Sequence, residues 1–285
     1  MKILVTGGGG FLGTAILKIL KNYPYELYSF SRNTYPHLET MGVKNLTGDL
    51  SDYQSVKKAL TGMDAVFHVA AKAGVWGDYE DYFNANFMGT KNIVDACLEL
   101  KIKKCVYTSS PSTILDQPNL NGVDESLDYP TRFSCAYAET KALAEKYLLS
   151  HAHPTDFLVV ALRPHLIWGP GDPHIFPRLF SKASEGKLKI VGNGRNLVDV
   201  TYVDNAANAH VQAFHHLAPG SKVTGKVYFI GQNEPVNLWN FINQALTMNG
   251  QKPVTTKIPF SLVYAIGFML EKIYGLLKLK SEPPM

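Results

Sequence analysis

A doubly wound parallel α/β sheet is the fold class that the sequence predicts. Apolar segments suited to buried strands alternate with segments suited to helices, as in sheets whose parallel strands are joined by helices. A glycine-rich turn also joins the first expected strand to the first expected helix. We expect this sheet domain to occupy residues 1–162. Residues 163–285 are expected to form mainly a small lobe, with segments that return to the sheet.

The order of the elements follows from the apolar runs. The expected elements are a strand at Lys2–Thr6, a helix at Phe11–Leu20, strands at Glu26–Phe30 and near Val43, Ala65 and Cys105, a helix at Ser134–Ser150 and a strand at Asp156–Leu162. Beyond that last strand the sequence is rich in Pro and Gly and leaves the regular pattern, so the smaller lobe is expected to begin there.

The turn after the first strand carries a dinucleotide-binding pattern. Gly7 permits a tight turn, Gly10 lets a phosphate approach the backbone, and Gly13 lets the helix pack on the strand. Backbone amides at the helix start, with Phe11 and Leu12 in the first turn, can hold a pyrophosphate. Taken alone, the glycines also suit a structural turn or a flavin site. Their place between an N-terminal strand and a helix favours a dinucleotide-binding Rossmann fold.

A Tyr and a Lys four residues apart form the second signal. Tyr137 and Lys141 share one face of the expected helix, which by itself is typical of an exposed pair. The strand at Lys104–Thr108, however, ends in Ser109 and Ser110 upstream of that helix. A strand ending in serines, a loop and a Tyr-x-x-x-Lys helix, downstream of a dinucleotide pattern, resemble the extended branch of the short-chain dehydrogenase/reductase superfamily.

The resemblance covers essentially the whole chain. Its further landmarks are Gly48–Leu50, Phe67–Ala71, Asn84–Asn92, Arg163–Pro164, Trp168–Asp172 and Val200–Asn205. The runs Ala70–Gly77, Tyr107–Ser112 and Leu162–Asp172 resemble the 3β-hydroxysteroid dehydrogenase-like group. Within that group the sequence is most similar to reductases of 2-alkyl-3-oxoalkanoates, and sterol-4-carboxylate dehydrogenases share many of the same motifs.

The resemblance implies an NAD(P)-dependent oxidoreductase and a set of site residues. Tyr137 would be the acid/base, while Lys141 would favour its phenolate and hold the nicotinamide ribose. Ser110 would donate a hydrogen bond to the substrate oxygen; Ser109 is the alternative, but strand alternation points it to the other face. Asn86 would support the helix and a water path to Lys141. Cofactor contacts are further implied at Asp49, Leu50, Ala70, Ala71, Lys72 and Pro164.

The end of the second strand bears on the choice of cofactor. NAD-binding members of such folds carry an acid there, which binds the ribose hydroxyls and repels a 2′-phosphate. This chain has Ser31 at that point and Arg32 beside it. A hydroxyl and a guanidinium can bind the 2′-phosphate, so we expect NADP, with NAD as the alternative. Arg32 as an ordinary surface residue is the competing interpretation.

The expected substrate is a large apolar acid whose 3-oxo group is reduced to a 3-hydroxy group by hydride transfer. Its pocket would be built by the loop after Ala71, the segment Ser112–Tyr129 and the lobe after Pro164. The candidates to meet a substrate carboxylate are Lys72, His165, His174 and Arg195, and those to line an apolar tunnel are Trp76, Tyr79, Tyr82, Phe83 and Trp168. Each of them also suits an ordinary loop or core position.

Other activities remain as alternatives. A 3β-hydroxysteroid or sterol-4-carboxylate dehydrogenase is the alternative enzyme. A nucleotide-sugar epimerase or dehydratase is less favoured, because Pro111 and Ser112 stand where such enzymes usually carry a small residue followed by Val-Tyr-Gly. A non-enzymatic NADP sensor is disfavoured because such proteins usually lose the Tyr and Lys pair.

Composition and charge argue against nucleic-acid-binding, metal-binding and secreted proteins. The net charge is +4 over 285 residues, and the basic residues form no aromatic-interleaved stripe, so no nucleic-acid partner is expected. The cysteines, Cys97, Cys105 and Cys135, lack metal-ligand spacing, so we expect no metal and a reduced, cytoplasmic protein. The first strand begins at Lys2 with no apolar leader, so no signal peptide is expected.

The C-terminal region is strongly apolar over Pro259–Leu277, but Glu271 and Lys272 interrupt it, so a full membrane span is not expected. We expect a substrate-lobe helix, or alternatively an interfacial helix that contacts a membrane with the help of Lys272, Lys278 and Lys280. Relatives continue beyond a motif like Pro283–Pro284, so a truncated lobe is expected. The resemblance also implies a homodimer formed by the helices that bear Asn86 and Tyr137.

Overall fold

The computed structural model of the protein describes residues 1–115, 120–277 and 279. It divides into two compact units. The first unit contains Met1–His165 and Val203–Ile230, and the second contains Leu166–Tyr202 and the residues from Gly231 onward. The expected boundary after residue 162 lies close to the end of the first segment, and Val203–Ile230 is a segment that returns to the first unit.

Seven parallel strands from the described part of the chain form the sheet of the first unit, in the order β11-β6-β5-β4-β1-β2-β3. They are β1 (Lys2–Thr6), β2 (Glu26–Ser31), β3 (Lys44–Thr47), β4 (Ala65–His68), β5 (Lys104–Thr108), β6 (Leu158–Pro164) and β11 (Lys226–Ile230). The predicted doubly wound α/β class is confirmed. The strand order reverses direction between β1 and β4, which is the switch point where such sheets bind ligands.

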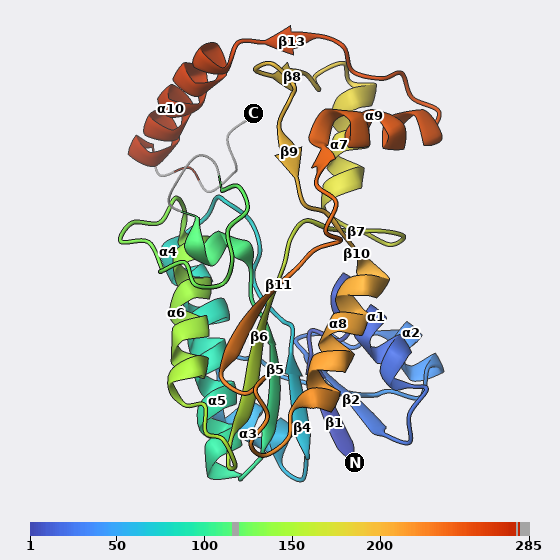
Figure 1. Ribbon diagram of the computed structural model, residues 1–285, viewed down its shortest axis with the longest axis vertical. Helices are drawn as coiled ribbons and strands as arrows, with labels where there is room; N and C mark the ends of the chain where they lie inside the picture. Colours follow the sequence, from blue (N-terminus) through green and yellow to red (C-terminus); the bar gives the residue numbers. More distant parts are fainter. Residues whose placement is uncertain (116–119, 278, 280–285) are drawn as a thin grey trace. The chain divides into compact units, whose positions relative to one another are not determined.

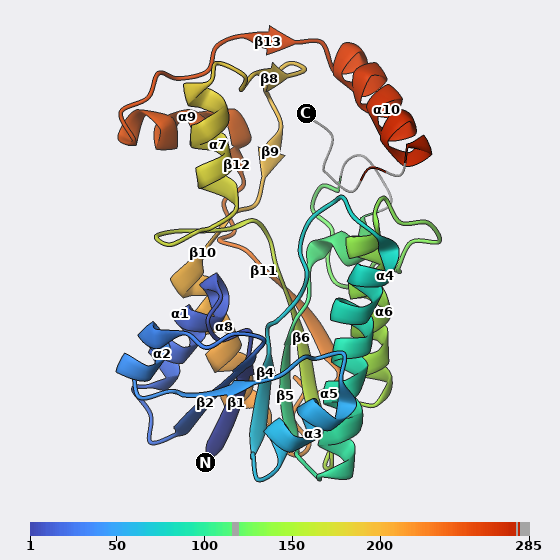
Figure 2. The ribbon, with the colours of Figure 1, turned by 180° about the vertical axis from the view of Figure 1, so that it is seen from behind.

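Helices cover both faces of this sheet (Figures 1 and 2). One face carries α1 (Phe11–Leu20) and α8 (Val203–His216), and the other carries α3 (Tyr53–Leu60), α5 (Gly89–Glu99) and α6 (Ala136–Ser150). The shorter helices are α2 (Pro36–Thr40), α4 (Tyr79–Tyr82), the π-helix η1 (Phe83–Met88), which runs into α5, and the 3₁₀ helix η2 (Pro111–Ile114).

The core of the first unit explains why its strands read as continuous apolar runs. Every residue of β4 and of β6 is buried, because helices exclude water from both faces of the sheet. On α1 the buried side chains Leu12, Ile16 and Leu20 recur at helical spacing and face the sheet. Each such side chain contributes roughly 1.5–3 kcal/mol on burial.

The second unit combines helices with pairs of two-residue strands. They are α7 (Ile175–Ser184), α9 (Leu238–Met248), α10 (Phe260–Leu276) and the strand pairs β7 (Ile167–Trp168) with β10 (Thr201–Tyr202), β8 (Ile190–Val191) with β13 (Lys257–Ile258), and β9 (Leu197–Val198) with β12 (Val236–Asn237). The Trp168 ring packs against Phe176, Tyr202 and Phe241 at centroid distances of 5.1 to 6.2 Å. These partly buried rings form an aromatic cluster within the unit.

The apolar C-terminal segment forms α10, and most of its large side chains are exposed, including Phe260, Tyr264 and Met269. Within the described residues no helix is both long and apolar enough to cross a bilayer. The predicted landmarks Lys278, Lys280 and Pro283–Pro284 lie outside the described residues, as do residues 116–119 of the segment expected to border the substrate pocket.

Candidate active site

The carboxyl ends of the central strands carry the residues that the sequence analysis singled out. The glycine turn follows β1, Ala70 and Ala71 follow β4, Ser110 follows β5, and Pro164 ends β6. Because these strands are parallel neighbours, their carboxyl ends meet at one edge of the sheet, beside the switch point. The first unit therefore assembles the candidate site from segments far apart in the sequence.

The glycine turn has the tight geometry that its sequence predicts. Gly7 has a φ of 66°, in the left-handed region that favours glycine. Its N–H donates to the Phe30 carbonyl oxygen at 2.9 Å, and the Gly10 N–H donates to the Gly7 carbonyl oxygen at 2.9 Å. These bonds tie the turn to β2 and close it on itself.

The first turn of α1 fits a pyrophosphate. A Cβ at Gly13 would lie 2.2 Å from the Gly7 carbonyl oxygen, so helix and turn approach each other only because residue 13 is glycine. Among the described residues, a Cβ at Gly10 would meet only that same oxygen, at 3.2 Å. Gly10 caps α1 without a side chain, so the N–H groups of Phe11 and Leu12 need an acceptor from elsewhere. Such a cradle suits an anion.

Gly9 has a packing role that the sequence analysis missed. A Cβ at this position would lie 2.2 Å from Cδ2 of Tyr35, whose half-buried ring rests against the turn. Tyr35 stands in the loop after β2, where no local pattern signals such a contact. The ring therefore forms one wall of the glycine turn.

The residues expected at the ribose phosphate lie at the end of β2 and on the turn after β3. The Ser31 hydroxyl donates to a backbone carbonyl two residues further on, at 2.9 Å, and Arg32 is exposed. Asp49 accepts hydrogen bonds from Ser51 that hold its pKa below the usual range, and the charge of Arg32 adds to this effect. The charge of Arg32 therefore acts on the Asp49 carboxylate. Leu50 follows Asp49 on the same turn.

Ser110 and Tyr137 come together at the end of β5. The Ser110 side chain acts on Tyr137 and lowers the pKa of the tyrosine in part. Burial has the larger effect and raises that pKa. Tyr137 therefore keeps its proton at neutral pH, which suits an acid. The Ser109 Oγ is buried with no hydrogen-bond partner among the described residues.

Lys141 lies one helical turn after Tyr137, and only 2% of it is exposed. Its Nζ donates to the Thr108 carbonyl oxygen at 2.6 Å and lies 4.1 Å from the centre of the Tyr107 ring. Burial lowers the pKa of Lys141 to about 7, while the Glu145 carboxylate acts in the opposite direction. Strongly shifted, buried lysines of this kind are concentrated at functional sites.

Asn86 lies in the π-helix η1 and is buried. Its Oδ1 accepts from the Lys72 N–H at 2.7 Å, and its Nδ2 donates to the Lys72 carbonyl at 3.1 Å and to Thr140 Oγ1 at 3.1 Å. Asn86 therefore joins the loop after β4 to α6, the helix that carries Tyr137 and Lys141. Helical turns of the π type are frequent at functional sites.

His68 forms a second bridge, which the sequence analysis did not identify. Its Nδ1 is 2.8 Å from Thr6 Oγ1, and its Nε2 is 2.9 Å from Thr90 Oγ1. Because the Thr90 hydroxyl donates to the Asn86 carbonyl at 2.6 Å, the His68 Nε2–H must donate to Thr90, and Nδ1 accepts from Thr6. Burial lowers the pKa of His68 to about 3, so the ring is neutral. The bridge links the residue before the glycine turn to the helix of Asn86.

A buried ion pair lies below the site. The Arg163 Nε donates to Glu145 Oε2 at 3.0 Å, and the Arg163 Nη2 lies 2.5 Å from Oε1, with both side chains at most 2% exposed. The Tyr129 hydroxyl donates to the same carboxylate at 2.7 Å. Arg163 was recognised only as a landmark, because its partner Glu145 lies on α6 and no local pattern connects the two.

Two residues expected to contact substrate have partners within the first unit. The Lys72 ammonium lies 2.6 Å from Asp81 Oδ2 and 4.9 Å from the centre of the Tyr82 ring. Tyr82 is 2% exposed, and its hydroxyl donates to the Trp76 carbonyl at 2.9 Å. Tyr82 is thus a core residue, and the Lys72 ammonium is shared with a carboxylate.

The remaining substrate candidates are divided between the units. His165 closes the first segment of the first unit, where its N–H donates to the Ile230 carbonyl at 3.1 Å. His174, just before α7, and the exposed Arg195 belong to the second unit. Trp168 belongs there too, in the aromatic cluster described above. The structure therefore does not gather these candidates within one unit.

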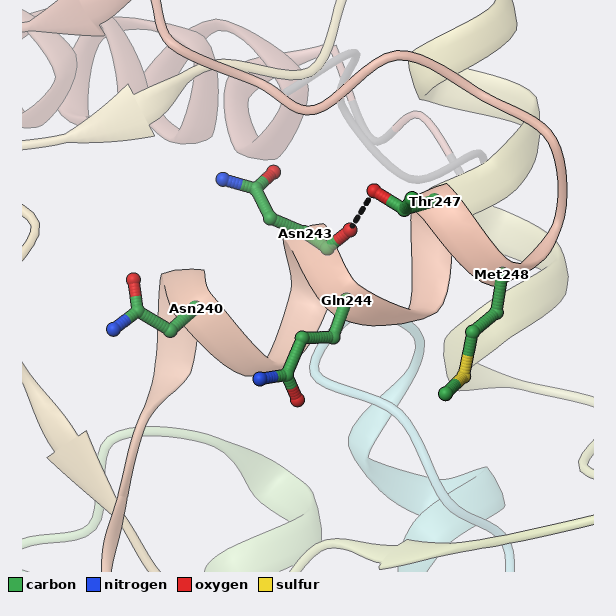
Figure 3. Close-up of a pocket in the computed structure, with 5 residues that line it drawn as sticks. All are labelled: Asn240, Asn243, Gln244, Thr247 and Met248. Atoms are coloured by element: carbon green, nitrogen blue, oxygen red, sulfur yellow. Dashed lines mark hydrogen bonds between the residues drawn. The ribbon is translucent and has the colours of Figure 1, made fainter.

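A pocket in the second unit runs along α9 (Figure 3). Within it, the Thr247 hydroxyl donates to the Asn243 carbonyl at 2.9 Å. The lining side chains are uncharged: Asn240, Asn243, Gln244, Thr247 and Met248. They provide no acid, base or nucleophile. In the part of the chain that the structure describes, no group of three or more His, Cys, Asp and Glu side chains is placed to hold a metal ion.

Known proteins resemble the chain over nearly its whole length. Residues 4–260 match the model of the 3-beta hydroxysteroid dehydrogenase/isomerase family. The 2-alkyl-3-oxoalkanoate reductase of Stenotrophomonas maltophilia is 47% identical, over 100% of this chain and 87% of that protein. The decarboxylating sterol-4-alpha-carboxylate 3-dehydrogenase of Mus musculus is 34% identical, over 94% of this chain and 74% of that protein.

A solved structure adds a comparison of folds. The UDP-glucuronic acid 4-epimerase from Bacillus cereus, in complex with NAD, has a TM-score of 0.77 and 26% identity, and the match covers 91% of this chain and 88% of that one. The similarity supports the Rossmann-type fold of the first unit.

Proposed function

Because the chain belongs to the 3-beta hydroxysteroid dehydrogenase/isomerase family, whose matching relatives are named reductases and dehydrogenases, we propose that it reduces the 3-oxo group of a 2-alkyl-3-oxoalkanoate to the 3-hydroxy acid. The observation that carries this proposal is the cluster of Ser110, Tyr137 and Lys141 at the switch point of the sheet. The relative named for this reaction matches the chain from end to end, and it retains its similarity across both units.

The residues have distinct tasks in the proposed reaction. The reduced nicotinamide, when bound, supplies the hydride. Ser110 donates a hydrogen bond to the substrate carbonyl oxygen and sets its distance from Tyr137. Tyr137 then gives its proton to that oxygen, which becomes the hydroxyl of the product. Lys141, with one hydrogen bond committed to Thr108, has donors left for the nicotinamide ribose.

The pKa of Tyr137 supports reduction as the working direction. Burial raises this pKa, so the resting residue is a phenol with a proton to give. The rate of reduction should therefore fall at alkaline pH, as Tyr137 loses its proton. In the oxidative direction the positive charge of the oxidised nicotinamide would favour the phenolate, and the Lys141 ammonium would add to it below the Lys141 pKa of about 7.

We propose NADPH as the cofactor, held at its pyrophosphate by Gly10 and the first turn of α1, in a turn whose shape depends on Gly7 and Gly13. The exposed Arg32 and the hydroxyl of Ser31 would bind the 2′-phosphate. Ser31→Asp should place a carboxylate there and shift preference towards NADH by at least about tenfold, or 1.4 kcal/mol. An unchanged ratio of the two dissociation constants would contradict this assignment.

The sterol-4-carboxylate relative favours a second candidate, oxidation of a 3β-hydroxyl group on a sterol acid. Both candidates share a large apolar skeleton with a carboxylate on the carbon next to the reacting carbon. Assays with the two substrate classes in parallel separate them. Turnover of the sterol acid with no reduction of the 2-alkyl-3-oxo acid would favour the second candidate.

We further propose that the second unit binds the apolar part of the substrate and that α10 contacts a membrane surface. Phe260, Leu262 and Phe268 are each at least half exposed, and Lys272 lies near the end of the helix. Such a helix gains free energy in the interface of a bilayer, where a lipid-like substrate also dissolves. Sedimentation with anionic phospholipid vesicles tests this, and recovery of the protein in the supernatant would contradict it.

A homodimer is the assembly we propose, through the α5 and α6 side of the first unit. An aromatic row runs along this side, with neighbouring ring centroids 4.5 to 6.0 Å apart, and its members are half-buried or exposed. The row consists of Tyr79, Phe83, Phe87, Tyr147 and His151. A second copy would cover it. Light scattering that gives a monomer mass at micromolar concentration would contradict this assembly.

Tyr137→Phe is the experiment that tests the proposed reaction. The variant lacks the transferable proton but keeps the ring and its packing, so turnover should fall at least about a hundredfold. The dissociation constant of NADPH should stay within about twofold of the wild type. Equal turnover in the variant would contradict the proposed mechanism. Loss of NADPH binding would show that the substitution also altered the cofactor site.

A further inference from the structure

Ser110 receives two hydrogen bonds from a single neighbour. Its Oγ accepts from the Ser112 backbone N–H at 3.2 Å and from the Ser112 hydroxyl at 2.9 Å. Ser110 is also the residue before η2, so the first of these bonds is a helix cap. In the sequence, Ser112 belongs to the run Tyr107–Ser112 and stands at the start of the segment expected to border the substrate pocket. The structure places it directly against the hydroxyl that would bind substrate.

The local chain makes this contact specific. Pro111 has no N–H, so it cannot bond the Ser110 side chain. Thr113 donates through its N–H at 3.2 Å and through its hydroxyl at 2.9 Å, and both bonds go to the Ser110 backbone carbonyl. Within η2, Thr113 thus holds the backbone carbonyl of Ser110, while Ser112 holds its hydroxyl.

A serine hydroxyl has one proton to donate and two lone pairs that accept. At Ser110 the two bonds from Ser112 occupy both lone pairs, so the proton is left to point elsewhere. Its other neighbour is Tyr137, whose pKa the Ser110 side chain lowers. Without the Ser112 hydroxyl, the proton of Ser110 would rotate among several directions. With it, the proton is directed towards Tyr137 in the resting site and towards the substrate oxygen once substrate is bound.

We propose that Ser112 is a positioning residue that fixes Ser110 as a hydrogen-bond donor to the reacting oxygen. The inference rests on the proposed reductase function and extends it by one residue. Ser112 also strengthens the donor, because a hydroxyl that accepts a hydrogen bond donates its own proton more strongly. This role predicts an effect on the chemical step, whereas a substrate contact would act on binding.

The test compares Ser112→Ala with the conservative variant Ser112→Thr. Loss of one hydrogen bond should lower kcat about three- to tenfold in Ser112→Ala. KM and the dissociation constant of NADPH should stay within about twofold. In the enzyme without substrate, a weaker donor stabilises the Tyr137 phenolate less, so the alkaline fall of kcat/KM should move to higher pH. Ser112→Thr keeps the hydroxyl and should restore both kcat and the pH profile.

Wild-type kcat and pH profile in Ser112→Ala would overturn the inference. So would a loss confined to KM, which would make Ser112 a substrate contact, or a Ser112→Thr variant as impaired as Ser112→Ala. The thermal midpoint of each variant, measured alongside, identifies a loss of rate that comes from misfolding.

A titration without turnover keeps this inference separate from the proposed function. The Tyr137 ring carbon signal can be followed by NMR in protein labelled with ¹³C-tyrosine and saturated with NADP, and it is assigned by its absence in Tyr137→Phe. Ser112→Ala should raise the pKa of Tyr137 relative to wild type. If this shift is found but the 2-alkyl-3-oxo acid is not reduced, the proposed function fails and the positioning role stands. If the acid is reduced and the pKa is unchanged, the positioning role fails.

Discussion

Alanine at two glycines of the turn should separate folding from cofactor binding. A Cβ at Gly13 would lie 2.2 Å from the Gly7 carbonyl oxygen and 2.8 Å from the Gly8 Cα, so backbone must move to admit it. Overpacking of this kind costs about 1–3 kcal/mol, and its severity here points to the upper end of that range. Alanine inside a helix recovers about 1 kcal/mol over glycine. The net loss for Gly13→Ala should be about 2 kcal/mol.

Gly10→Ala is the matched variant. Its φ of −79° is accessible to alanine, and its Cβ would meet only the Gly7 carbonyl oxygen, at 3.2 Å, among the described residues. The free energy of unfolding should therefore fall by less than about 1 kcal/mol, chiefly through the poorer cap. The new methyl group would nevertheless stand where a phosphate must approach, so the dissociation constant of NADPH should rise at least about tenfold.

Thermal unfolding and fluorescence titration with NADPH provide the two readouts. Gly13→Ala should lower the thermal midpoint by about 4–8 °C. Gly10→Ala should keep a nearly unchanged midpoint but bind NADPH weakly. A Gly10→Ala protein that binds NADPH as tightly as the wild type would refute the pyrophosphate assignment. A Gly13→Ala protein with an unchanged midpoint would refute the packing argument.

Two further predictions concern the buried charges. Burial lowers the pKa of Lys141 to about 7 in the fold from 10.5 in the unfolded chain. Between these two pH values, unfolding is accompanied by the uptake of a proton. The free energy of unfolding therefore rises with pH across that window, by up to about 5 kcal/mol. Lys141→Met should remove this rise in urea unfolding measured from pH 6 to 10, and an identical pH dependence in the variant would contradict the burial of the charge. Glu145→Gln leaves Arg163 buried without its carboxylate and should cost about 3–5 kcal/mol in the same assay. A loss below about 1 kcal/mol would mean that the Arg163 charge has access to water.

The fold was predictable because its signals are local. Lys2–Thr6 and Phe11–Leu20 were expected at the bounds that the structure gives, and the predicted strand at Lys104–Thr108 also matches. Buried parallel strands appear as continuous apolar runs, and a glycine turn marks the first crossover. A smaller deviation occurs at the helix expected from Ser134, which begins at Ala136. Helix starts of this kind depend on capping, which the composition of a window describes poorly.

Much of the candidate site depends on contacts between distant residues, which local patterns do not encode. The pair of Arg163 and Glu145 and the bridge through His68 join different elements. The shift of the Tyr137 pKa also required the structure, because the sequence does not indicate the burial that raises this pKa. Patterns identified which residues bear the chemistry. Their protonation and their supporting partners followed from packing.

The most direct test of the central claim is the absorbance of NADPH at saturating concentration with purified protein and a long-chain 2-alkyl-3-oxo acid, with the product identified by mass spectrometry. We predict oxidation of NADPH together with formation of an equal amount of the 3-hydroxy acid, and slower oxidation of NADH at the same concentration. Tight binding of NADPH with no oxidation and no 3-hydroxy acid would contradict the proposed reaction.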